Sequence, residues 1–434
     1  MEYQEAIDFL FSRLPVFQNI GSKAFKPGLY NTLELCRLNG NPHQGFHSIH
    51  IGGTNGKGST SHMLAAVLQQ AGYKVGLYTS PHLKSFKERI KINGTEIEED
   101  FIVNFISDNL SNIDNLSPSF FELTVCMAFS YFKEKQVDVA IIEVGMGGRL
   151  DSTNVISPIL SLITNVSFDH VQFLGDTLSK IAFEKAGIIK GNVPVIIGEY
   201  EEESAAVFDQ VANTQNTKCH YASESIQIDN YELKDGLLKV ELIHQLYDNS
   251  YRRNLALDLT GSYQLKNVKS VILAVEILRG LGWDINEGNI EQALTNVGLL
   301  TGLKGRWQKL QSSPDVYCDT AHNFAGLEAT TKQVLSLTAK KYRFVLGFVS
   351  DKDVKQLLRL FPNGSNAIYY FCQPSNMRAI EVTSLQELGN ELGMQSHRFG
   401  NVNMAFQYAL AESDPEDVLY IGGSTFVVAD LNIL

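Results

Sequence analysis

The amino-acid sequence predicts an α/β protein built from two domains, each with a sheet covered by helices. Short apolar segments alternate with longer helical patterns along most of the 434 residues, which is typical of a parallel sheet. Several segments are apolar throughout, as expected for strands that are covered on both faces. A glycine-rich passage at residues 298–305 interrupts the alternation. We therefore expect a first domain at 1–298 and a smaller second domain at 299–434.

The predicted sheet of the first domain starts at residues 48–52, which run directly into a glycine-rich loop. A helix is expected to follow this loop and to end near Gly72. Its apolar residues would share one face, and they are Met63, Leu64, Val67, Leu68 and Ala71. Further apolar runs predict strands at 75–78, 139–142, 160–163 and 195–197.

A different pattern fills residues 219–257, where Asp and Asn separate short alternating runs such as 237–242. This pattern indicates a small antiparallel excursion from the parallel sheet. A helical stretch at 268–281 leads on to the second domain, where strands are predicted at 316–318, 343–349, 367–371 and 418–421. Ligands of such sheets bind at the carboxyl ends of the strands, and a cleft between two domains is a natural site.

Composition and charge narrow the classes of function. A net charge of −12 argues against a general nucleic-acid binder, which needs a positive surface, but not against small anionic ligands. No apolar run approaches the roughly 20 residues of a membrane span, and the acidic N-terminus differs from a secretory signal, so we expect a cytoplasmic protein. The five cysteines form no Cys-x-x-Cys pair, which suggests neither a zinc site nor a disulfide. Cys126, Cys318 and Cys372 are expected to pack in the core.

The glycine-rich loop is the strongest functional signal in the sequence. A strand, a glycine-rich turn and a helix together form the context that a phosphate-binding loop requires. Backbone N–H groups and the helix N-terminus can then converge on phosphate oxygens, with Lys57 bridging the terminal phosphates. The general pattern places a glycine at Ile51 and a hydroxyl residue at Gly58, so this loop departs from it. The predicted ATP-binding residues are Gly53, Thr54, Asn55, Gly56, Lys57, Gly58, Ser59 and Thr60.

The run Gly-Thr-Asn-Gly-Lys-Gly-Ser resembles the loop of folylpolyglutamate synthases and dihydrofolate synthases, within the Mur ligase superfamily. The resemblance spans nearly the whole chain, with its motifs in the expected order. They include Tyr-Thr-Ser-Pro-His-Leu at 78–83, Glu-Val-Gly-Met-Gly-Gly-Arg-Leu-Asp at 143–151, Glu-Lys-Ala-Gly-Ile-Ile-Lys at 184–190 and Asp-Thr-Ala-His-Asn at 319–323. The resemblance implies a P-loop-containing, ATPase-like first domain and a Rossmann-like second domain.

Candidate metal ligands follow the predicted strands. Glu143 ends an apolar run and, with the Ser80 hydroxyl, would suit Mg²⁺, which prefers oxygen ligands and keeps several waters. Gly58 stands where the general loop pattern has a metal-binding hydroxyl residue, so Ser80 is the better candidate for the hydroxyl ligand. The resemblance implies that His170 is a ligand of a second ion. It also implies that Lys185 reacts with carbon dioxide to give a carbamate, whereas Lys185 without this resemblance would be expected to form a salt bridge with a neighbouring carboxylate.

The resemblance also implies nucleotide contacts from Arg306, Asp319 and His322, if the two domains close over the nucleotide. Arg306 would neutralise charge on the transferring phosphoryl group, and His322 would help to position it. Asp319 would accept from ribose hydroxyls or orient Arg306. Gln264 and Asn267 resemble a family motif near the adenosine, although Tyr263 stands where the family often has His.

A pterin or folate acceptor needs a flat apolar slot with a few polar groups. Residues that resemble the family's pteroate contacts are Gly28, Leu29, Arg89, Phe121, Glu122, Leu150 and Asp151. Phe121 could instead be a core residue, which is the commoner position for such a side chain.

The expected reaction joins L-glutamate to a carboxylate of a folate, or of dihydropteroate, with cleavage of ATP and an acyl phosphate as intermediate. We expect both dihydrofolate synthase and folylpolyglutamate synthase activity, and a monomer. A peptidoglycan-precursor ligase of the same superfamily is one alternative, although only about 50 residues precede the loop, at the bottom of the domain range. A nucleotide-dependent switch is another, but it would leave the segment at 184–190 without a role.

Overall fold

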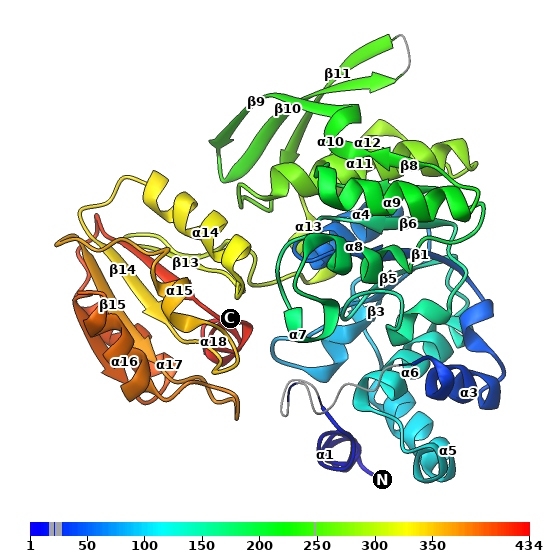
Figure 1. The fold of residues 1–434 in the computed structure, drawn as a ribbon, viewed down its shortest axis with the longest axis horizontal. Coiled ribbons are helices and arrows are strands. Elements are labelled where there is room, and N and C mark those ends of the chain that lie inside the picture. Colours follow the sequence, from blue (N-terminus) through cyan, green and yellow to red (C-terminus); the bar gives the residue numbers. More distant parts are fainter. Residues whose placement is uncertain (17–20, 22–27, 247–248) are drawn as a thin grey trace. The chain divides into compact units, whose positions relative to one another are not determined.

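The structure is a computed structural model that describes residues 1–16, 21, 28–246 and 249–434. It divides into two compact units, which we treat separately (Figure 1). Unit 1 contains Met1–Asp258 and Gln264–Leu303, whereas unit 2 contains Leu259–Tyr263 and Lys304–Leu434. The chain therefore passes from one unit to the other between residues 258 and 259, 263 and 264, and 303 and 304.

Unit 1 contains an eight-stranded sheet with the order β4-β3-β2-β5-β1-β6-β7-β8. Strands β2, β5, β1, β6, β7 and β8 are parallel, and the antiparallel strands β3 and β4 form one edge. The predicted parallel sheet is therefore confirmed. The strands are β1 (His47–Gly52), β2 (Val75–Tyr78), β3 (Ile90–Ile92), β4 (Thr95–Glu96), β5 (Val139–Glu143), β6 (Leu160–Ile163), β7 (Val195–Ile197) and β8 (Cys219–Tyr221).

Strand β1 lies between β5 and β6, so the carboxyl ends of three parallel strands meet where the glycine-rich loop begins. Helix α4 (Lys57–Gln70) leaves this loop and packs against the sheet, α11 and α12. All residues of α4 from Gly58 to Leu68 are buried. The helix is thus enclosed on all sides, whereas the sequence predicted a single apolar face. It also begins at Lys57, before the first apolar residue of that face.

Helices cover the sheet, and a large core cluster joins α1, α3, α5 and α6 to the strands. A second cluster joins α8 and α9 to β6, β7 and β8. The helices of unit 1 are α1 (Tyr3–Arg13), α3 (Tyr30–Leu38), η2 (Pro42–Gln44), η3 (Phe86–Arg89), α5 (Glu99–Leu116), α6 (Phe120–Glu134), η4 (Ser152–Val155), α7 (Val171–Leu174), α8 (Leu178–Ala186), α9 (Glu202–Thr214), α10 (Ala222–Ser225), α11 (Gln264–Gly280), α12 (Glu287–Leu294) and α13 (Val297–Thr301).

The predicted antiparallel excursion is a three-stranded sheet with the order β11-β10-β9, standing out from the rest of unit 1 (Figure 1). Its predicted start at residue 219 is wrong, because Cys219–Tyr221 pair in parallel with β7 as the edge strand β8. It consists of β9 (Ile226–Lys234), β10 (Leu237–Leu246) and β11 (Asn249–Leu257). Asp235 and Gly236, both with positive φ, form the turn between β9 and β10. Two such residues match the right-handed twist of a hairpin.

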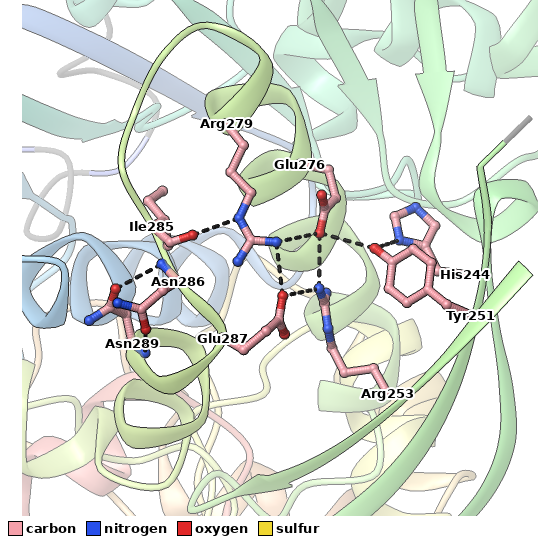
Figure 2. A network of polar contacts seen from close by, with 9 residues as sticks. All are labelled: His244, Tyr251, Arg253, Glu276, Arg279, Ile285, Asn286, Glu287 and Asn289. Atoms are coloured by element: carbon pink, nitrogen blue, oxygen red, sulfur yellow. Dashed lines mark hydrogen bonds and ion pairs between the residues drawn. The ribbon is translucent and has the colours of Figure 1, made fainter. Parts of the chain in front are cut away.

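A network of charged side chains fastens this sheet to α11 and α12 (Figure 2). Arg253 Nη2 donates to Glu276 Oε1 at 3.0 Å and to Glu287 Oε1 at 2.8 Å. Arg279 Nη1 donates to the same two oxygens, and Tyr251 OH donates to Glu276 Oε1 at 3.1 Å. Because Arg253 is only 7% exposed, removal of either carboxylate would leave a buried charge partly unpaired.

Unit 2 contains a six-stranded sheet with the order β12-β13-β17-β14-β15-β16, in which the edge strand β12 runs antiparallel. Its helices are α14 (Phe324–Ser336), α15 (Val354–Leu358), α16 (Val382–Glu391), α17 (Val402–Ala411) and α18 (Thr425–Asp430). The strands are β12 (Gln308–Gln311), β13 (Asp315–Cys318), β14 (Tyr342–Leu346), β15 (Ala367–Cys372), β16 (Ser396–Phe399) and β17 (Val418–Gly422).

The predicted strand at 343–349 is too long at its carboxyl end, because β14 stops at Leu346. A Cβ on the next residue, Gly347, would lie 2.7 Å from Cys372 O, so the chain passes close to a neighbouring backbone there.

All five cysteines are buried and free, and Cys126, Cys318 and Cys372 pack in the core as predicted. No helix in the described part of the chain is long and apolar enough to cross a membrane.

Candidate functional site

The glycine-rich loop follows β1, and two of its glycines occupy positions that no other residue could take. Gly53 has φ +136° and Gly56 has φ +85°, in the region that favours glycine. A Cβ on Gly53 would lie 1.9 Å from Thr164 Oγ1, and one on Gly56 would lie 2.3 Å from Asn267 Oδ1. The loop is therefore pressed against the segment after β6 and against the first turn of α11.

The segment after β6 holds the loop by side-chain and backbone hydrogen bonds. Thr54 N donates to Asn165 O at 3.0 Å, and Asn55 N donates to Asn165 Oδ1 at 3.1 Å. Thr164 Oγ1 donates to Asn55 O at 2.6 Å. No role was assigned to Thr164 and Asn165 in the sequence analysis. Their contacts fix the path of the loop, so they are structural partners of the phosphate cradle.

Lys57 is the first residue of α4, and its ammonium group folds over the loop. Nζ donates to Gly53 O and to Thr54 O, both at 3.1 Å. Two carbonyls thus hold the cation beside the N–H groups of the loop. In this position Lys57 adds positive charge to a helix N-terminus, which favours an anionic ligand.

Gln264 and Asn267 lie beside the buried first turn of α4, and their contact with an adenosine stays a prediction. Gln264 Nε2 donates to Ser59 Oγ at 3.1 Å. Asn267 Nδ2 donates to Gln264 Oε1 at 2.7 Å, and Asn267 also borders Gly56. Both amides are buried, so these contacts fix the start of α11 to the phosphate loop.

The two candidate magnesium ligands are neighbours. Glu143 is the last residue of β5, pairs with Ile51 of β1 and is only 4% exposed. Its Oε2 accepts a hydrogen bond from Ser80 N at 3.1 Å, just after β2. A buried carboxylate and a neighbouring hydroxyl residue supply the hard oxygen donors that Mg²⁺ prefers. The donor set therefore fits this ion.

Lys185 is buried in the last turn of α8 and is only 2% exposed. Burial, helped by the nearby charge of Lys57 and opposed by Asp169, lowers the pKa of its amine to about 7. A substantial fraction of the amine is therefore neutral near pH 7. No hydrogen bond or ion pair joins the Lys185 amine to another of the described residues, so the salt bridge that was its alternative interpretation is not formed.

His170 precedes α7 and has a left-handed backbone, with φ +48°. Its own N–H donates to Asp169 Oδ1 at 2.8 Å, and its Nε2 lies 3.9 Å from the same oxygen. Asp169 thus interacts with His170 and acts electrostatically on Lys185. Sequence reasoning gave Asp169 no role, although an acidic residue directly before a candidate ligand was an available signal.

Close backbone packing positions α8. A Cβ on Gly187 would lie 2.2 Å from Arg149 Cα, and one on Gly148 would lie 2.9 Å from Glu184 O. Arg149 N donates to Glu184 O at 2.7 Å, and Arg149 Nη2 donates to Glu184 Oε1 at 2.8 Å. The turn at 147–149 and the end of α8 therefore meet without intervening side chains, which places Lys185.

Unit 2 carries a second group of predicted residues, at the ends of β13 and of the segment before β12. Arg306 Nη1 donates to Thr320 Oγ1 and, at 3.3 Å, to Gly305 O. His322 Nδ1 lies 3.1 Å from Thr320 O. The Asp319 carboxylate is buried between these two turns, and burial raises its pKa above the usual range.

Comparison with known proteins agrees with this geometry. Residues 51–275 match the Mur ligase middle domain, and residues 305–425 match the Mur ligase, glutamate ligase domain. Folylpolyglutamate synthase of Lacticaseibacillus casei is 30% identical over 99% of this chain and 97% of its own length. A structure described as E. coli FolC in complex with DHPP and ADP aligns with a TM-score of 0.84 at 28% identity, covering 99% of this chain and 96% of that one.

This chain belongs to the folylpolyglutamate and dihydrofolate synthases. It is a ligase of the Mur ligase family, as the sequence motifs implied. The chain spans only 50% of a longer relative from Haloferax volcanii, described as a probable bifunctional folylpolyglutamate synthase/dihydropteroate synthase, to which it is 30% identical.

One predicted acceptor residue of this synthase, Phe121, contacts the segment that follows Glu143. The Phe121 ring, in the first turn of α6, packs on the backbone of Gly145 and lies 6.1 Å from the Tyr78 ring. Arg89 is buried, and its Nε donates to His82 Nδ1 at 2.7 Å. These contacts bring Phe121 next to the candidate magnesium ligand.

The other acceptor candidates of the synthase have local structural contacts. Glu122 Oε2 accepts from Ser119 N at 2.6 Å and so caps α6. Gly28 has φ +126°, and Leu29 directly precedes α3. Leu150 is half-buried, whereas Asp151 is buried. Their contacts with a folate stay a prediction.

Asp151 belongs to a buried chain of hydrogen bonds, which we call the relay, formed with His50, Thr153 and Met146. Its Oδ1 accepts from Thr153 N and from Thr153 Oγ1, and its Oδ2 accepts from Met146 N at 2.9 Å. His50 Nε2 lies 2.9 Å from Thr153 Oγ1, and because that hydroxyl donates to Asp151, Nε2 must carry the proton. The relay links β1 to the loop after Glu143.

Acid is expected to destabilise the synthase through His50. Burial and the charge of Lys190 lower its pKa to about 3, so the folded protein keeps the ring neutral. The unfolded chain takes up this proton below a pKa of about 6.5, so the stabilisation is complete above that pH and is lost as the pH falls towards 3. Urea unfolding should show a slope from this residue that is shallow at pH 7 and approaches about 1.4 kcal/mol per pH unit near pH 5. His50→Gln removes that slope, whereas a variant of the exposed His47 keeps it; an unchanged slope in His50→Gln would contradict this assignment.

Replacing Gly187 with alanine is expected to destabilise the synthase and to lower its activity, because the new methyl group would meet the Arg149 backbone. The cost expected for overpacking is about 1–3 kcal/mol in urea unfolding. The matched control is Gly280→Ala at the end of α11, where a Cβ would meet nothing within 4 Å. Equal stability of the two variants would show that the turn at 147–149 is not packed against α8 as described.

Proposed function

We propose that the chain is an ATP-dependent amide ligase that adds L-glutamate to folates. Its acceptors would be tetrahydrofolate, whose glutamate tail it extends, and dihydropteroate, which it converts to dihydrofolate. One observation carries the proposal: a phosphate loop with Lys57, the Glu143–Ser80 pair and the buried Lys185 all lie in unit 1, around the carboxyl ends of β1, β5 and β6. The names of the relatives support the choice of folate and glutamate.

Amide formation from a carboxylate needs activation, because a carboxylate is a poor electrophile. A carboxylate oxygen of the acceptor attacks the γ-phosphorus of ATP, the bond to ADP breaks, and an acyl phosphate forms. The N–H groups of the loop and Lys57 stabilise charge on the phosphates, and Arg306 neutralises charge on the transferred group. The amine of glutamate then attacks the acyl carbon, loses a proton and displaces inorganic phosphate.

Glu143 and Ser80 would hold Mg²⁺, which supplies charge neutralisation on the phosphate oxygens when it is bound. Glu143 is suited to this duty because its carboxylate is buried at a strand end beside the phosphate loop. His170, with Lys185 as a carbamate, would supply ligands for a second ion. Asp169 orients His170 by contact with its backbone N–H and its ring.

Carbamate formation at Lys185 begins with the neutral amine. Nζ attacks the carbon of CO₂, a C–N bond forms, and one proton leaves to solvent, so an anion with two oxygens replaces the neutral amine. The lowered pKa of about 7 supports this step, because burial disfavours the charged ammonium. The carbamate would also remove the repulsion between Lys185 and the charge of Lys57.

The test is an assay of the purified chain with ATP, Mg²⁺, L-glutamate and one acceptor at a time. The acceptors are dihydropteroate, tetrahydrofolate and a UDP-muramyl peptide precursor, with amide product identified by mass and phosphate release measured in parallel. Product from both pteridine acceptors, with one phosphate for each amide, is the expected result. Product from only one of them would restrict the activity to that acceptor. Product from the muramyl substrate alone would overturn the proposal.

A further inference from the structure

The buried Asp319 carboxylate accepts three hydrogen bonds from three separate segments of unit 2. Its Oδ2 accepts from Tyr263 OH and from Trp307 N, both at 2.6 Å. Its Oδ1 accepts from Ala321 N at 2.8 Å. Asp319 is only 2% exposed, so these protein donors take the place of water around both oxygens.

Two of these donors fix the turns that carry the predicted nucleotide residues. Trp307 directly follows Arg306, and its φ of +48° is unusual for a bulky side chain. The hydrogen bond from Trp307 N to Asp319 helps to hold this backbone. Ala321 directly precedes His322, and Thr320 N donates to Gly305 O at 3.0 Å, which joins the two turns. Asp319 therefore positions Arg306 and His322 together.

The third donor, Tyr263, comes from the short linker at 259–263. This linker is docked onto unit 2, because Gln333 Nε2 donates to Thr260 O at 3.0 Å and Ser262 N donates to Gln333 Oε1 at 2.7 Å. The Tyr263 ring packs over Gly261, where a Cβ would lie 2.8 Å from the ring. The hydroxyl of Tyr263 is thus aimed at Asp319 by a fixed linker.

The next residue has a contact of a different kind. Gln264 belongs to unit 1, where its amide donates to Ser59 Oγ beside the phosphate loop. Two consecutive residues therefore form hydrogen bonds with different groups of predicted site residues. Tyr263 is bonded to the carboxylate that positions Arg306 and His322, and Gln264 is bonded to the helix that begins at Lys57.

We propose that Tyr263 is a positioning residue for phosphoryl transfer. Its hydroxyl fixes Asp319, and through Asp319 it fixes the Arg306 and His322 turns relative to the linker at 259–263. This inference rests on the proposed function, in which Arg306 acts on the transferring phosphoryl group. The phenol donates to Asp319, so its effect reaches the reaction through the side chains that Asp319 holds.

Tyr263→Phe is expected to lower kcat about tenfold or more, with little change in KM for ATP, because a hydrogen bond to a charged group is lost and Arg306 acts chiefly in the transition state. Tyr263→His, which can restore a donor, should recover most of the loss. The matched control is Tyr342→Phe, which removes another hydroxyl of unit 2, bonded to Leu337 O at 2.8 Å, and should leave kcat unchanged. A kcat of Tyr263→Phe within twofold of the wild type would overturn the proposal.

Two further measurements separate this role from a general loss of structure and from failure of the proposed function. In an Arg306→Ala background, Tyr263→Phe should cost less than it does in the wild type, because one of the two side chains that it positions is already removed; full additivity would contradict the proposal. Amide hydrogen exchange needs no activity at all. Protection of peptides covering 305–307 and 320–322 should fall in Tyr263→Phe but not in Tyr342→Phe, and unchanged protection would overturn the proposal even if the wild type proved to use another substrate.

Discussion

Lys185→Ala is expected to lower kcat by about 10²–10³-fold, the loss that follows removal of one group that stabilises developing charge. The change removes the carbamate anion that would hold the second ion with His170, without touching the phosphate loop. The control is Lys180→Ala on the same helix, where the lysine is exposed and pairs with Asp176, and its activity should stay within twofold of the wild type. Steady-state kinetics with saturating ATP would measure both variants.

Chemical rescue by small carboxylates is a second test of the carbamate at Lys185. Acetate or formate added to Lys185→Ala should restore part of the lost activity, because each supplies two oxygens where the carbamate stood. Full activity of Lys185→Ala without any addition would contradict the carbamate role.

The lowered pKa of Lys185 also predicts how wild-type enzyme recovers after removal of CO₂. Its amine pKa of about 7 means that more of it is neutral at pH 8 than at pH 6. Activity should therefore return faster at pH 8 when the same concentration of dissolved CO₂ is added back. Equal rates at the two pH values would show that the neutral amine does not limit recovery.

Arg306→Ala is expected to have the largest effect of any single change in unit 2, a loss of about 10³-fold or more in kcat, as for arginines that neutralise a transferring phosphoryl group. The side chain is half-buried and held by Thr320 and Gly305, so its geometry is set before the substrate binds. Arg306→Lys should recover little, because an ammonium group cannot reproduce the planar guanidinium.

The matched control for Arg306 is Arg398→Ala, which removes an exposed arginine from β16 of the same unit. It should leave kcat unchanged and cost little stability. Equal losses in the two variants would indicate a general charge effect, and a loss smaller than tenfold in Arg306→Ala would remove Arg306 from the transfer step.

The sequence was sufficient for the inner parallel strands of both sheets, because strands covered on both faces carry continuous apolar runs. Three strands of unit 1 have the predicted bounds, at 75–78, 160–163 and 195–197. Strands β12 and β16 had no such signal. They are short edge strands with polar residues, and an edge strand needs little apolar burial.

The candidate site was predictable where chemistry lies in a local motif. The phosphate loop follows this rule, since Gly53, Gly56 and Lys57 stand within five positions. Lys185 and His170 could be chosen only through the family resemblance. The pairing of Glu143 with Ser80, and of Asn165 with the loop, joins residues far apart in sequence, and such contacts leave no local pattern.

The contacts of Asp319 show most clearly what could not be predicted from the sequence. Its type and position suggested contact with ribose or orientation of Arg306, and only the folded chain brings Tyr263, Trp307 and Ala321 around its carboxylate. The first of these donors comes from a linker 56 residues upstream.

The central claim is that this chain activates a folate carboxylate by phosphoryl transfer before glutamate attacks. Acceptor carrying ¹⁸O in the reacting carboxylate, incubated with ATP, Mg²⁺ and L-glutamate, tests it directly. Activation through an acyl phosphate predicts a glutamylated product, with one ¹⁸O atom of each reacting carboxylate recovered in inorganic phosphate. Glutamylated product accompanied by phosphate without the label would contradict an acyl phosphate, and labelled acceptor recovered unchanged while ATP is consumed would contradict the ligase activity itself.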